Sequence, residues 1–241
     1  MNEYLNKKLL HQDFSIGKIP GLDSYLEIAA GYAMTENAIA VLSDLKANRS
    51  HIFYGGLGEF LGIAEKGTYR CIDSIWEEEI LCRIPREDLE QKQLDELQFF
   101  DFVRHREKAG NHYMMSLMSM IGADGSSMNV LHRIFYFSDG MAVRYALCLY
   151  TPASAEIRSA IVDSVTGEQI PLEQIDTAGM LSEREKEVLR LIDEGRSSKE
   201  IASHMNISIH TVSRHRQNIL EKLRARNSAH ACKMAKGLKV I

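Results

Sequence analysis

The spacing of apolar residues divides the chain into two parts. From residue 181 to the end, apolar side chains recur every three or four positions, which is the period of amphipathic helices. Earlier in the chain, apolar and polar residues alternate in three runs that predict strands, at 112–121, 128–137 and 142–150. Asp-Gly pairs at 124–125 and 139–140 separate these runs and are typical of hairpin turns. Residues 171–180 follow neither period and are expected to form a linker.

Residues 36–170 are predicted to form an α+β domain with an antiparallel sheet and flanking helices. Two short strands are expected at 39–44 and 51–54, and apolar residues spaced by about 3.6 positions indicate a helix at 86–106. The order of these elements, with a glycine-rich turn after the second strand, resembles a PAS-like sensor domain; a GAF-like domain is the alternative. Residues 1–35 are expected to form an N-terminal helical extension.

Residues 181–241 carry signals for an all-α domain of four helices. Two capping boxes mark the starts of the first two helices: Ser182 with Glu185, and Ser197 with Glu200. A tight turn after Met205 separates the second helix from a third at 209–223, and a last, alanine-rich helix is expected at 228–236. Two helices joined by a tight turn form a helix-turn-helix.

The third of these helices has two dissimilar faces when its residues are placed about 100° apart. One stripe is apolar: Ile209, Val212, Ile219, Leu220 and Leu223. The opposite face is polar and basic apart from its last member: His210, Ser213, Arg214, Gln217 and Glu221. Because the apolar stripe docks the helix on its own domain, the far face is free to meet something else. This arrangement is the one that reads the major groove of DNA.

The same segment resembles the LuxR/NarL-type C-terminal DNA-binding domain over about 60 residues. The matching positions include many outside the core: 181–185, 187–189, Gly195, 198–202, 207–208, 211–212, His215, 218–219 and 222–223. The resemblance implies a bacterial transcription regulator that binds double-stranded DNA as a homodimer, with RNA polymerase as a partner. In such domains the last helix, here 228–236, is typically the one that dimerises.

The resemblance also implies roles for individual residues. Base-reading positions fall on Ser213, Arg214 and Gln217, where Arg suits guanine, Gln suits adenine and Ser suits either. Many relatives carry Lys where this chain has Ser213, so that contact is expected to be weaker or mediated by water. Phosphate-contacting positions fall on Ser198, Lys199, Thr211, His215 and Lys222. Arg216 lies nearer the apolar stripe, which leaves both an internal ion pair and a phosphate contact open.

Charge is distributed unequally between the two parts. The net charge of −4 combines +6 over residues 177–241 with −10 over the remainder. Residues 208–241 hold eight Lys or Arg and a single acidic residue, Glu221. A local basic surface on an acidic protein favours an anionic partner such as DNA for the C-terminal part.

Composition and motifs exclude several other classes. With 45% apolar and 26% charged residues, the chain has the composition of a globular protein. We find no apolar run long enough for a membrane helix and no signal peptide, so a cytoplasmic protein is expected. The four cysteines lack the short spacing of zinc motifs, and no cofactor or metal is expected. No catalytic motif appears, which argues against an enzyme.

The input to the N-terminal domain is left open by the sequence. Met114, Met118, Trp76 and Arg133 are candidates for lining a ligand pocket, because soft methionines and polar-tipped residues suit an adaptable cavity. The competing interpretation is that the methionines fill the core and Arg133 pairs with an acidic neighbour. A small-molecule ligand and a protein partner docking on this domain both remain as hypotheses.

Overall fold

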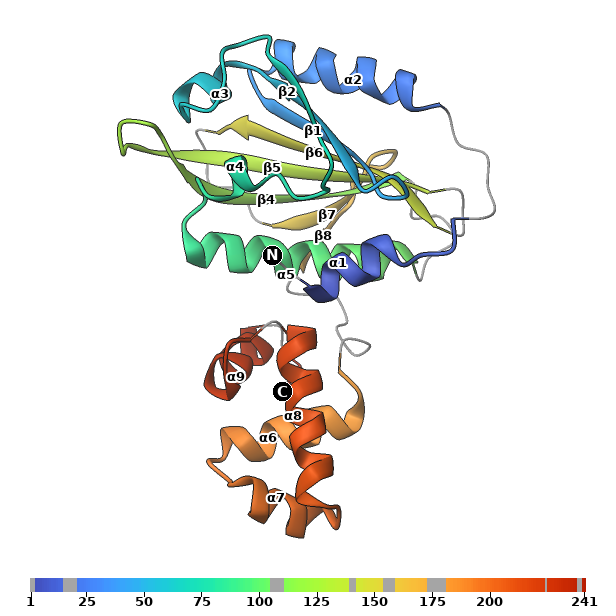
Figure 1. Cartoon of the computed structure of the whole chain (residues 1–241), viewed down its shortest axis with the longest axis vertical. Helices are drawn as coiled ribbons and strands as arrows, with labels where there is room; N and C mark the ends of the chain where they lie inside the picture. Colours follow the sequence, from blue (N-terminus) through green and yellow to red (C-terminus); the bar gives the residue numbers. More distant parts are fainter. Residues whose placement is uncertain are drawn as a thin grey trace. The chain divides into compact units, whose positions relative to one another are not determined.

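The computed structural model describes residues 3–14, 21–104, 111–138, 142–153, 159–172, 181–223, 225–237 and 240–241. Two compact units emerge from the contacts between residues (Figure 1). The first holds Lys7–Leu172; the second holds Glu173–Ile241 and, from the other end of the chain, Asn2–Asn6. The boundary between Leu172 and Glu173 lies within the stretch 171–180 that was expected to be a linker; residues 173–180 of that stretch are outside the described residues.

The first unit is built on an eight-stranded antiparallel sheet with the order β3-β2-β1-β6-β5-β4-β7-β8. The strands are β1 (Ile39–Asp44), β2 (Arg49–Tyr54), β3 (Tyr69–Ile72), β4 (His112–Ile121), β5 (Ser127–Ser138), β6 (Val143–Pro152), β7 (Ala160–Asp163) and β8 (Gln169–Pro171). The N-terminal strand β1 lies between β2 and β6, so the two predicted groups of strands join into one sheet.

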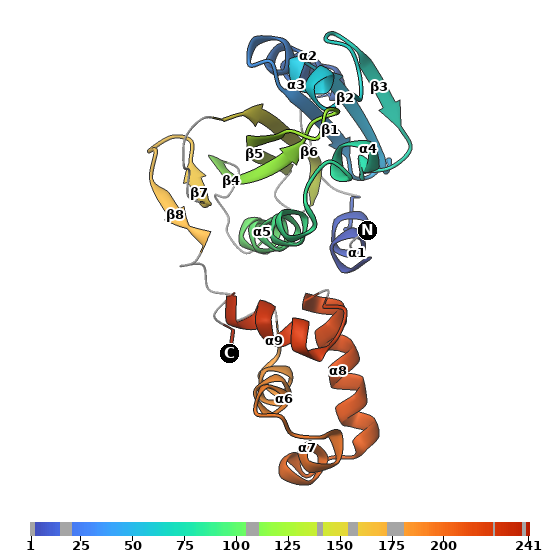
Figure 2. The ribbon, with the colours of Figure 1, turned by 90° about the vertical axis from the view of Figure 1, so that its left-hand side faces the viewer.

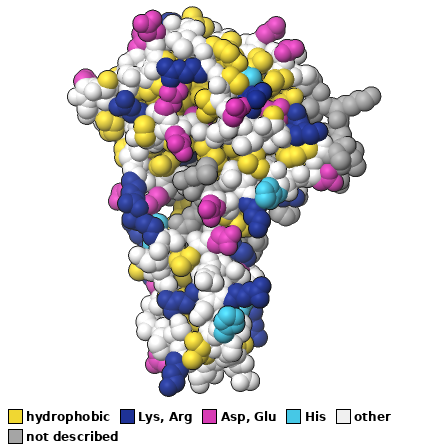
Figure 3. Space-filling model, viewed as in Figure 1, with side chains coloured by type: hydrophobic (Ala, Val, Ile, Leu, Met, Phe, Trp, Pro, Cys, Tyr) yellow, Lys and Arg dark blue, Asp and Glu magenta, His cyan; other side chains and the backbone are white. Residues whose placement is uncertain are grey.

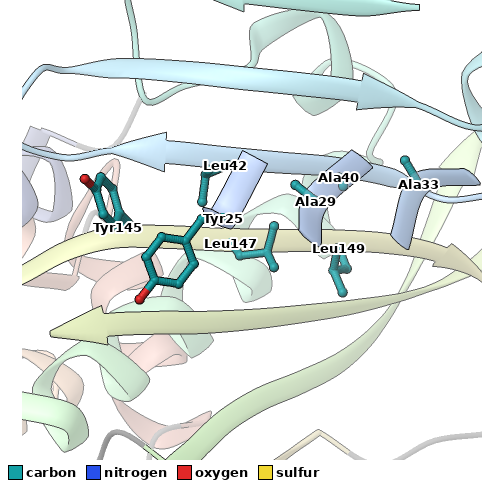
Figure 4. Packing of buried hydrophobic residues seen from close by; sticks show 8 residues of the cluster. All are labelled: Tyr25, Ala29, Ala33, Ala40, Leu42, Tyr145, Leu147 and Leu149. Carbon is teal, nitrogen blue, oxygen red and sulfur yellow. The ribbon is translucent and has the colours of Figure 1, made fainter. Parts of the chain in front are cut away.

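Helices cover both faces of this sheet. The helices of this unit are α2 (Leu22–Thr35), α3 (Gly56–Phe60), α4 (Glu78–Leu81) and α5 (Arg86–Arg104). The N-terminal helix α1 (Glu3–Leu10) is divided, since its residues up to Asn6 are grouped with the second unit and those from Lys7 with the first. Figure 2 shows α2 and α5 on opposite sides of the sheet. On the α2 side, Tyr25, Ala29 and Ala33 pack onto the sheet; the strand residues in this cluster are Ala40, Leu42, Tyr145, Leu147 and Leu149 (Figure 4). The small alanines let the helix approach the sheet closely, so residues 22–35 are part of this unit's core.

The other face of the sheet packs against α5. Along β4, Met114, Met118 and Met120 are almost fully buried and alternate with half-buried residues, as one face of a strand requires. Phe99 of α5 stacks on Tyr136 of β5, with ring centroids 5.1 Å apart. A hydrogen bond also joins the strand to the helix, because the backbone N of Ser119 in β4 donates to Asp88 Oδ2 of α5 at 2.8 Å.

The predicted fold class is confirmed in both units. The first is α+β, with the element order on which the PAS-like resemblance rested, and the second is a helical bundle. The edge strand β3 was not predicted, because its exposed sequence YRCI shows no alternation of buried and exposed residues. The short pair β7 and β8 is joined by a turn in which Asp163 Oδ1 accepts from Val165 N and Thr166 N, and Gly167 takes a φ of 75°.

The second unit consists of α6 (Glu183–Asp193), α7 (Ser198–Met205), α8 (Ile209–Leu223) and α9 (Ser228–Gly237). Both predicted capping boxes are present, at Ser182 and Ser197. The core of this bundle is formed by fully buried apolar side chains from every helix: Val188, Leu189, Ile201, Val212, Ile219, Leu223, Ala231 and Ala235. No described helix is long and apolar enough to cross a membrane.

Leu149→Ala tests the packing of the first unit. Leu149 is fully buried between β6 and α2, so we expect the substitution to lower the free energy of unfolding by about 2–5 kcal/mol. Trp76 is the single tryptophan of the chain and is buried in this unit, so its fluorescence during urea denaturation measures the change. The control Val165→Ala, at a side chain that is 73% exposed, should shift stability by less than about 0.5 kcal/mol. Equal effects would contradict the described packing.

Candidate nucleic-acid interface

A tight turn sets the relation between α7 and α8. Asn206 ends α7 in the left-handed conformation, with φ 55° and ψ 45°, which asparagine tolerates better than most residues. Ile207 N then donates to Ala202 O at 3.0 Å, closing the helix end. Ser208 starts α8 by accepting from Thr211 N at 3.0 Å. Each residue of the connection takes part in a local hydrogen bond or helix cap, so the turn holds the two helices in a fixed relation.

Three buried side chains fix which face of α8 points outward. Val212, Ile219 and Leu223 are no more than 1% exposed, and Leu220 is half-buried. The prediction that Ile209 belongs to this buried stripe is wrong, since its side chain is 52% exposed. Ile209 is the first residue of the helix and precedes the turn in which Val212 begins the buried stripe.

Arg216 holds α8 to both neighbouring helices. Its Nη1 donates to Ser198 Oγ of α7 at 3.0 Å, and its Nη2 donates to Ser228 Oγ of α9 at 2.8 Å. The sequence left an ion pair and a phosphate contact open, and the structure shows hydroxyl acceptors instead. The planar, forked guanidinium suits two acceptors on different helices. Arg216 therefore orients the helix from inside the domain.

The outward face of α8 carries the three predicted base-reading residues. Ser213, Arg214 and Gln217 are all exposed. Within the described part of the chain, none of the three makes a hydrogen bond or ion pair, so their polar atoms are available to a ligand. Ile209 lies four residues before Ser213, which places its exposed side chain in the same row along the helix. Sequence reasoning missed Ile209 because helical periodicity alone does not show where the scaffold ends.

The predicted phosphate-contacting residues differ in their exposure and in whether their side chains already have a hydrogen-bond partner. Lys199 is exposed at the start of α7, and Thr211 and His215 are half-buried beside the reading face. Thr211 Oγ1 lies 2.8 Å from Ser208 Oγ. Ser198 accepts from Arg216, as described above. Figure 3 shows basic and histidine side chains on the visible face of this unit.

Lys222 has an internal partner. Its Nζ lies 2.7 Å from Glu185 Oε2, and the Glu185 side chain is only 4% exposed. Burial would raise the pKa of Glu185, but the hydrogen bonds from Lys222 and from Ser182 outweigh it and hold that pKa below its usual range. The pair joins the end of α8 to the capping box of α6, so Lys222 has a structural role that the sequence did not reveal.

The four candidate ligand residues of the first unit are not brought together. Met114 and Met118 face α5 as core side chains. Trp76 lines a cavity of about 30 Å³ on the face of the sheet that packs against α5. This cavity has room for water but not for a metabolite. Arg133 is ion-paired with Glu36 and also donates to Thr151 Oγ1 at 3.3 Å.

Comparison with known proteins agrees with the geometry of the second unit. Residues 179–235 match the family model described as bacterial regulatory proteins, luxR family. This part of the chain is therefore a LuxR-type helix-turn-helix domain. The transcriptional regulatory protein DesR of Bacillus subtilis is 35% identical over 88 residues, which are 34% of this chain and 44% of DesR. The response regulator protein VraR of Staphylococcus aureus is 50% identical over 52 residues, or 22% of this chain and 25% of VraR.

The chain thus covers less than half the length of these curated relatives. Two solved structures align over most of the chain. A phage VqmA–DPO complex has 17% identity and a TM-score of 0.32, with 92% of this chain and 94% of that one covered. Escherichia coli SdiA has 16% identity and a TM-score of 0.26, with 93% of each chain covered. Scores this low carry no argument about the ligand or assembly of this chain.

The Glu185–Lys222 pair makes the stability of the second unit depend on pH. Because folding lowers the pKa of Glu185, its contribution is present above the ordinary glutamate pKa of about 4.3 and is lost as pH falls through the lower folded value. We expect Glu185→Gln to weaken hydrogen-exchange protection of α6 and α8 near pH 7, and the difference from wild type to shrink below about pH 4. The control is Glu194→Gln, at an exposed residue. A difference that stays constant with pH would show that the pair is not ionised.

Proposed function

We propose that this protein is a sequence-specific transcription regulator that reads DNA through α8 under the control of its N-terminal unit. One observation carries the proposal: a helix after a tight turn buries one stripe and leaves Ser213, Arg214 and Gln217 exposed and unpartnered on the other. The match of residues 179–235 to the luxR-family model supports a DNA-binding role for this unit. The residue roles, the dimer and the signal are the proposed parts.

The reading face suits hydrogen-bonded contacts in the major groove. Arg214 offers two parallel donors to O6 and N7 of guanine, and the Gln217 amide suits N6 and N7 of adenine. Ser213 has a short hydroxyl that reaches a base edge directly or through water. Ile209 adds an apolar surface that can contact the methyl group of thymine. Replacing that thymine by uracil should then weaken binding by wild type but not by Ile209→Ala.

Phosphate contacts surround this face. Lys199 and Thr211 lie near the N-terminal ends of α7 and α8, where backbone N–H groups and the helix dipole also favour anions, and His215 lies one turn further along α8. Lys222 and Ser198 are engaged with Glu185 and Arg216, so we assign them to positioning first and to phosphate second.

Binding as a homodimer follows from the size of one reading helix. A single α8 spans few base pairs, and two copies on a two-fold-related site double the contacts. On α9, Ala229 and Lys233 are exposed and available for this pairing, whereas exposed Lys236 is ion-paired with Asp193 at 2.8 Å. The regulator then acts in the cytoplasm, where the dimer bound at a promoter contacts RNA polymerase.

Two kinds of input remain in competition for the first unit. A small-molecule ligand requires an enlarged cavity, because the one beside Trp76 holds only about 30 Å³. A protein partner requires an accessible apolar surface, and α2 offers Ile28 and Met34, which are 46% and 50% exposed. Docking of a protein partner is the alternative input that we propose for this unit. Either input would act by shifting the population of DNA-competent dimers.

Removal of the reading side chains tests the proposal. On a site selected from random DNA with the wild-type protein, Arg214→Ala and Gln217→Ala should each cost about 1–3 kcal/mol in binding and relax preference at one base position. Measuring Kd by fluorescence anisotropy over single-base variants of the site gives both numbers. His204→Ala, at an exposed α7 residue outside the face, is the matched control. Unchanged specificity in both variants would place base reading elsewhere.

Lys199→Ala should behave differently from the reading variants. We expect weaker binding to all DNA sequences alike, with the slope of log affinity against log salt reduced by about one, because one counterion fewer is released. Titrations at several salt concentrations measure the slope. The contrasting variant is Lys222→Ala, whose main effect should be lower stability through loss of the Glu185 pair. A loss confined to one base position in Lys199→Ala would contradict the phosphate role.

A further inference from the structure

A cluster of buried polar side chains lies between α5 and the centre of the sheet. Glu96 comes from α5, His132 from β5 and Cys148 from β6, and all three are buried. On the sheet, Ile134 pairs with Cys148, so His132 lies two residues along the same face. One potential donor atom from each of the three residues lies within 4.8 Å of the other two.

His132 has no hydrogen-bond partner that would explain its position. Its side chain is 0% exposed, and neither ring nitrogen makes a hydrogen bond within the described part of the chain. An imidazole in its neutral form carries a lone pair on one ring nitrogen, which can bind a ligand. A buried imidazole in this state normally has a ligand or a hydrogen bond.

We propose that Glu96, His132 and Cys148 form a binding site for a divalent transition-metal ion of the Zn²⁺ type. Imidazole, thiolate and carboxylate are the three donor types that Zn²⁺ takes in proteins. His132 Nε2 lies 3.7 Å from Glu96 Oε1. Two donors each about 2.0–2.1 Å from a tetrahedral ion are about 3.4 Å apart, so these two atoms need to approach each other only slightly to bind one ion.

The surrounding charges fit a divalent ion once the thiol is deprotonated. Among the described residues, charged groups beside the cluster include Lys92, whose Nζ donates to Glu96 Oε1 at 2.6 Å, and Glu77, which accepts from Tyr150 Oη at 2.7 Å. Binding forms a metal–sulfur bond and releases the Cys148 proton to solvent. The ion's two charges and Lys92 then balance the thiolate and two carboxylates. Without an ion, the two carboxylates exceed the single ammonium, and burial raises the pKa of Glu77.

A small cavity beside the three residues leaves space for a fourth ligand. The cavity of about 30 Å³ is lined by Glu96, Cys148, Glu77 and Lys92, among others, and can hold a water molecule. Three protein ligands and one open position are typical of zinc sites that exchange their fourth ligand. The bound ion would join α5 to β5 and β6. The site stands independently of the proposed DNA-reading role.

Cobalt titration of the full-length chain tests this assignment. Metal-free, reduced protein should take up one equivalent of Co²⁺ and develop a thiolate-to-Co²⁺ charge-transfer band in the near ultraviolet. Zn²⁺ should abolish the band, whereas excess Mg²⁺ should not, because a hard cation competes poorly for thiolate. Absence of the band in wild type would overturn the proposal without requiring any variant.

Cysteine variants then identify the thiolate that gives rise to the band. Cys148→Ser should remove it, while Cys232→Ser, at a buried cysteine of the second unit, should leave it unchanged. A band that survives in Cys148→Ser and disappears when exposed Cys71 or Cys82 is replaced would also overturn the assignment. Far-ultraviolet circular dichroism confirms that each variant is folded. DNA affinity, measured separately on metal-free protein, keeps failure of this site distinct from failure of the reading face.

Discussion

Burial of the apolar stripe on α8 is the constraint on which the proposed reading of DNA depends. With Val212, Ile219 and Leu223 packed inside the bundle, the helix cannot rotate, and Arg214 and Gln217 must point outward. Two polar contacts refine this orientation: Arg216 ties the helix to α7 and α9, and Lys222 ties its end to the cap of α6. Apolar packing thus fixes the rotation of the helix, and the partly buried polar contacts join it to the neighbouring helices. Rigid support of this kind is what a base-reading helix requires.

The first unit contains a different balance of forces. Its sheet is packed on both faces by apolar layers, yet a group of ionisable residues is enclosed between α5 and the strands. Burial alone would lower the pKa of Lys92, but the Glu96 and Glu77 carboxylates outweigh it and raise the pKa to about 12. Enclosing such groups is costly unless they are paired, and His132 has no hydrogen-bond partner in the described residues.

Local patterns in the sequence were sufficient for much of this architecture. Capping boxes, alternation and helical period predicted the C-terminal helices, the meander of β4, β5 and β6, and the fold class of both units. Contacts between residues distant in sequence could not be predicted. Periodicity placed Ile209 inside, although the scaffold does not extend to it, and it treated Lys222 as free because Glu185 is 37 residues away. The grouping of Glu96, His132 and Cys148 arises from the register of β5 with β6 and from the packing of α5 on the sheet, so the absence of short zinc motifs gave no sign of it.

The central claim is that Arg214 reads a base, and 7-deazaguanine tests it most directly. This analogue replaces N7 by carbon and so removes one of the two acceptors that a bidentate arginine uses. The account predicts that one guanine of the selected site, when replaced, weakens binding by wild type but leaves binding by Arg214→Ala unchanged. Equal losses for wild type and Arg214→Ala at every guanine would show that Arg214 contacts no guanine N7, and would contradict the assignment of α8 as the reading helix through this residue.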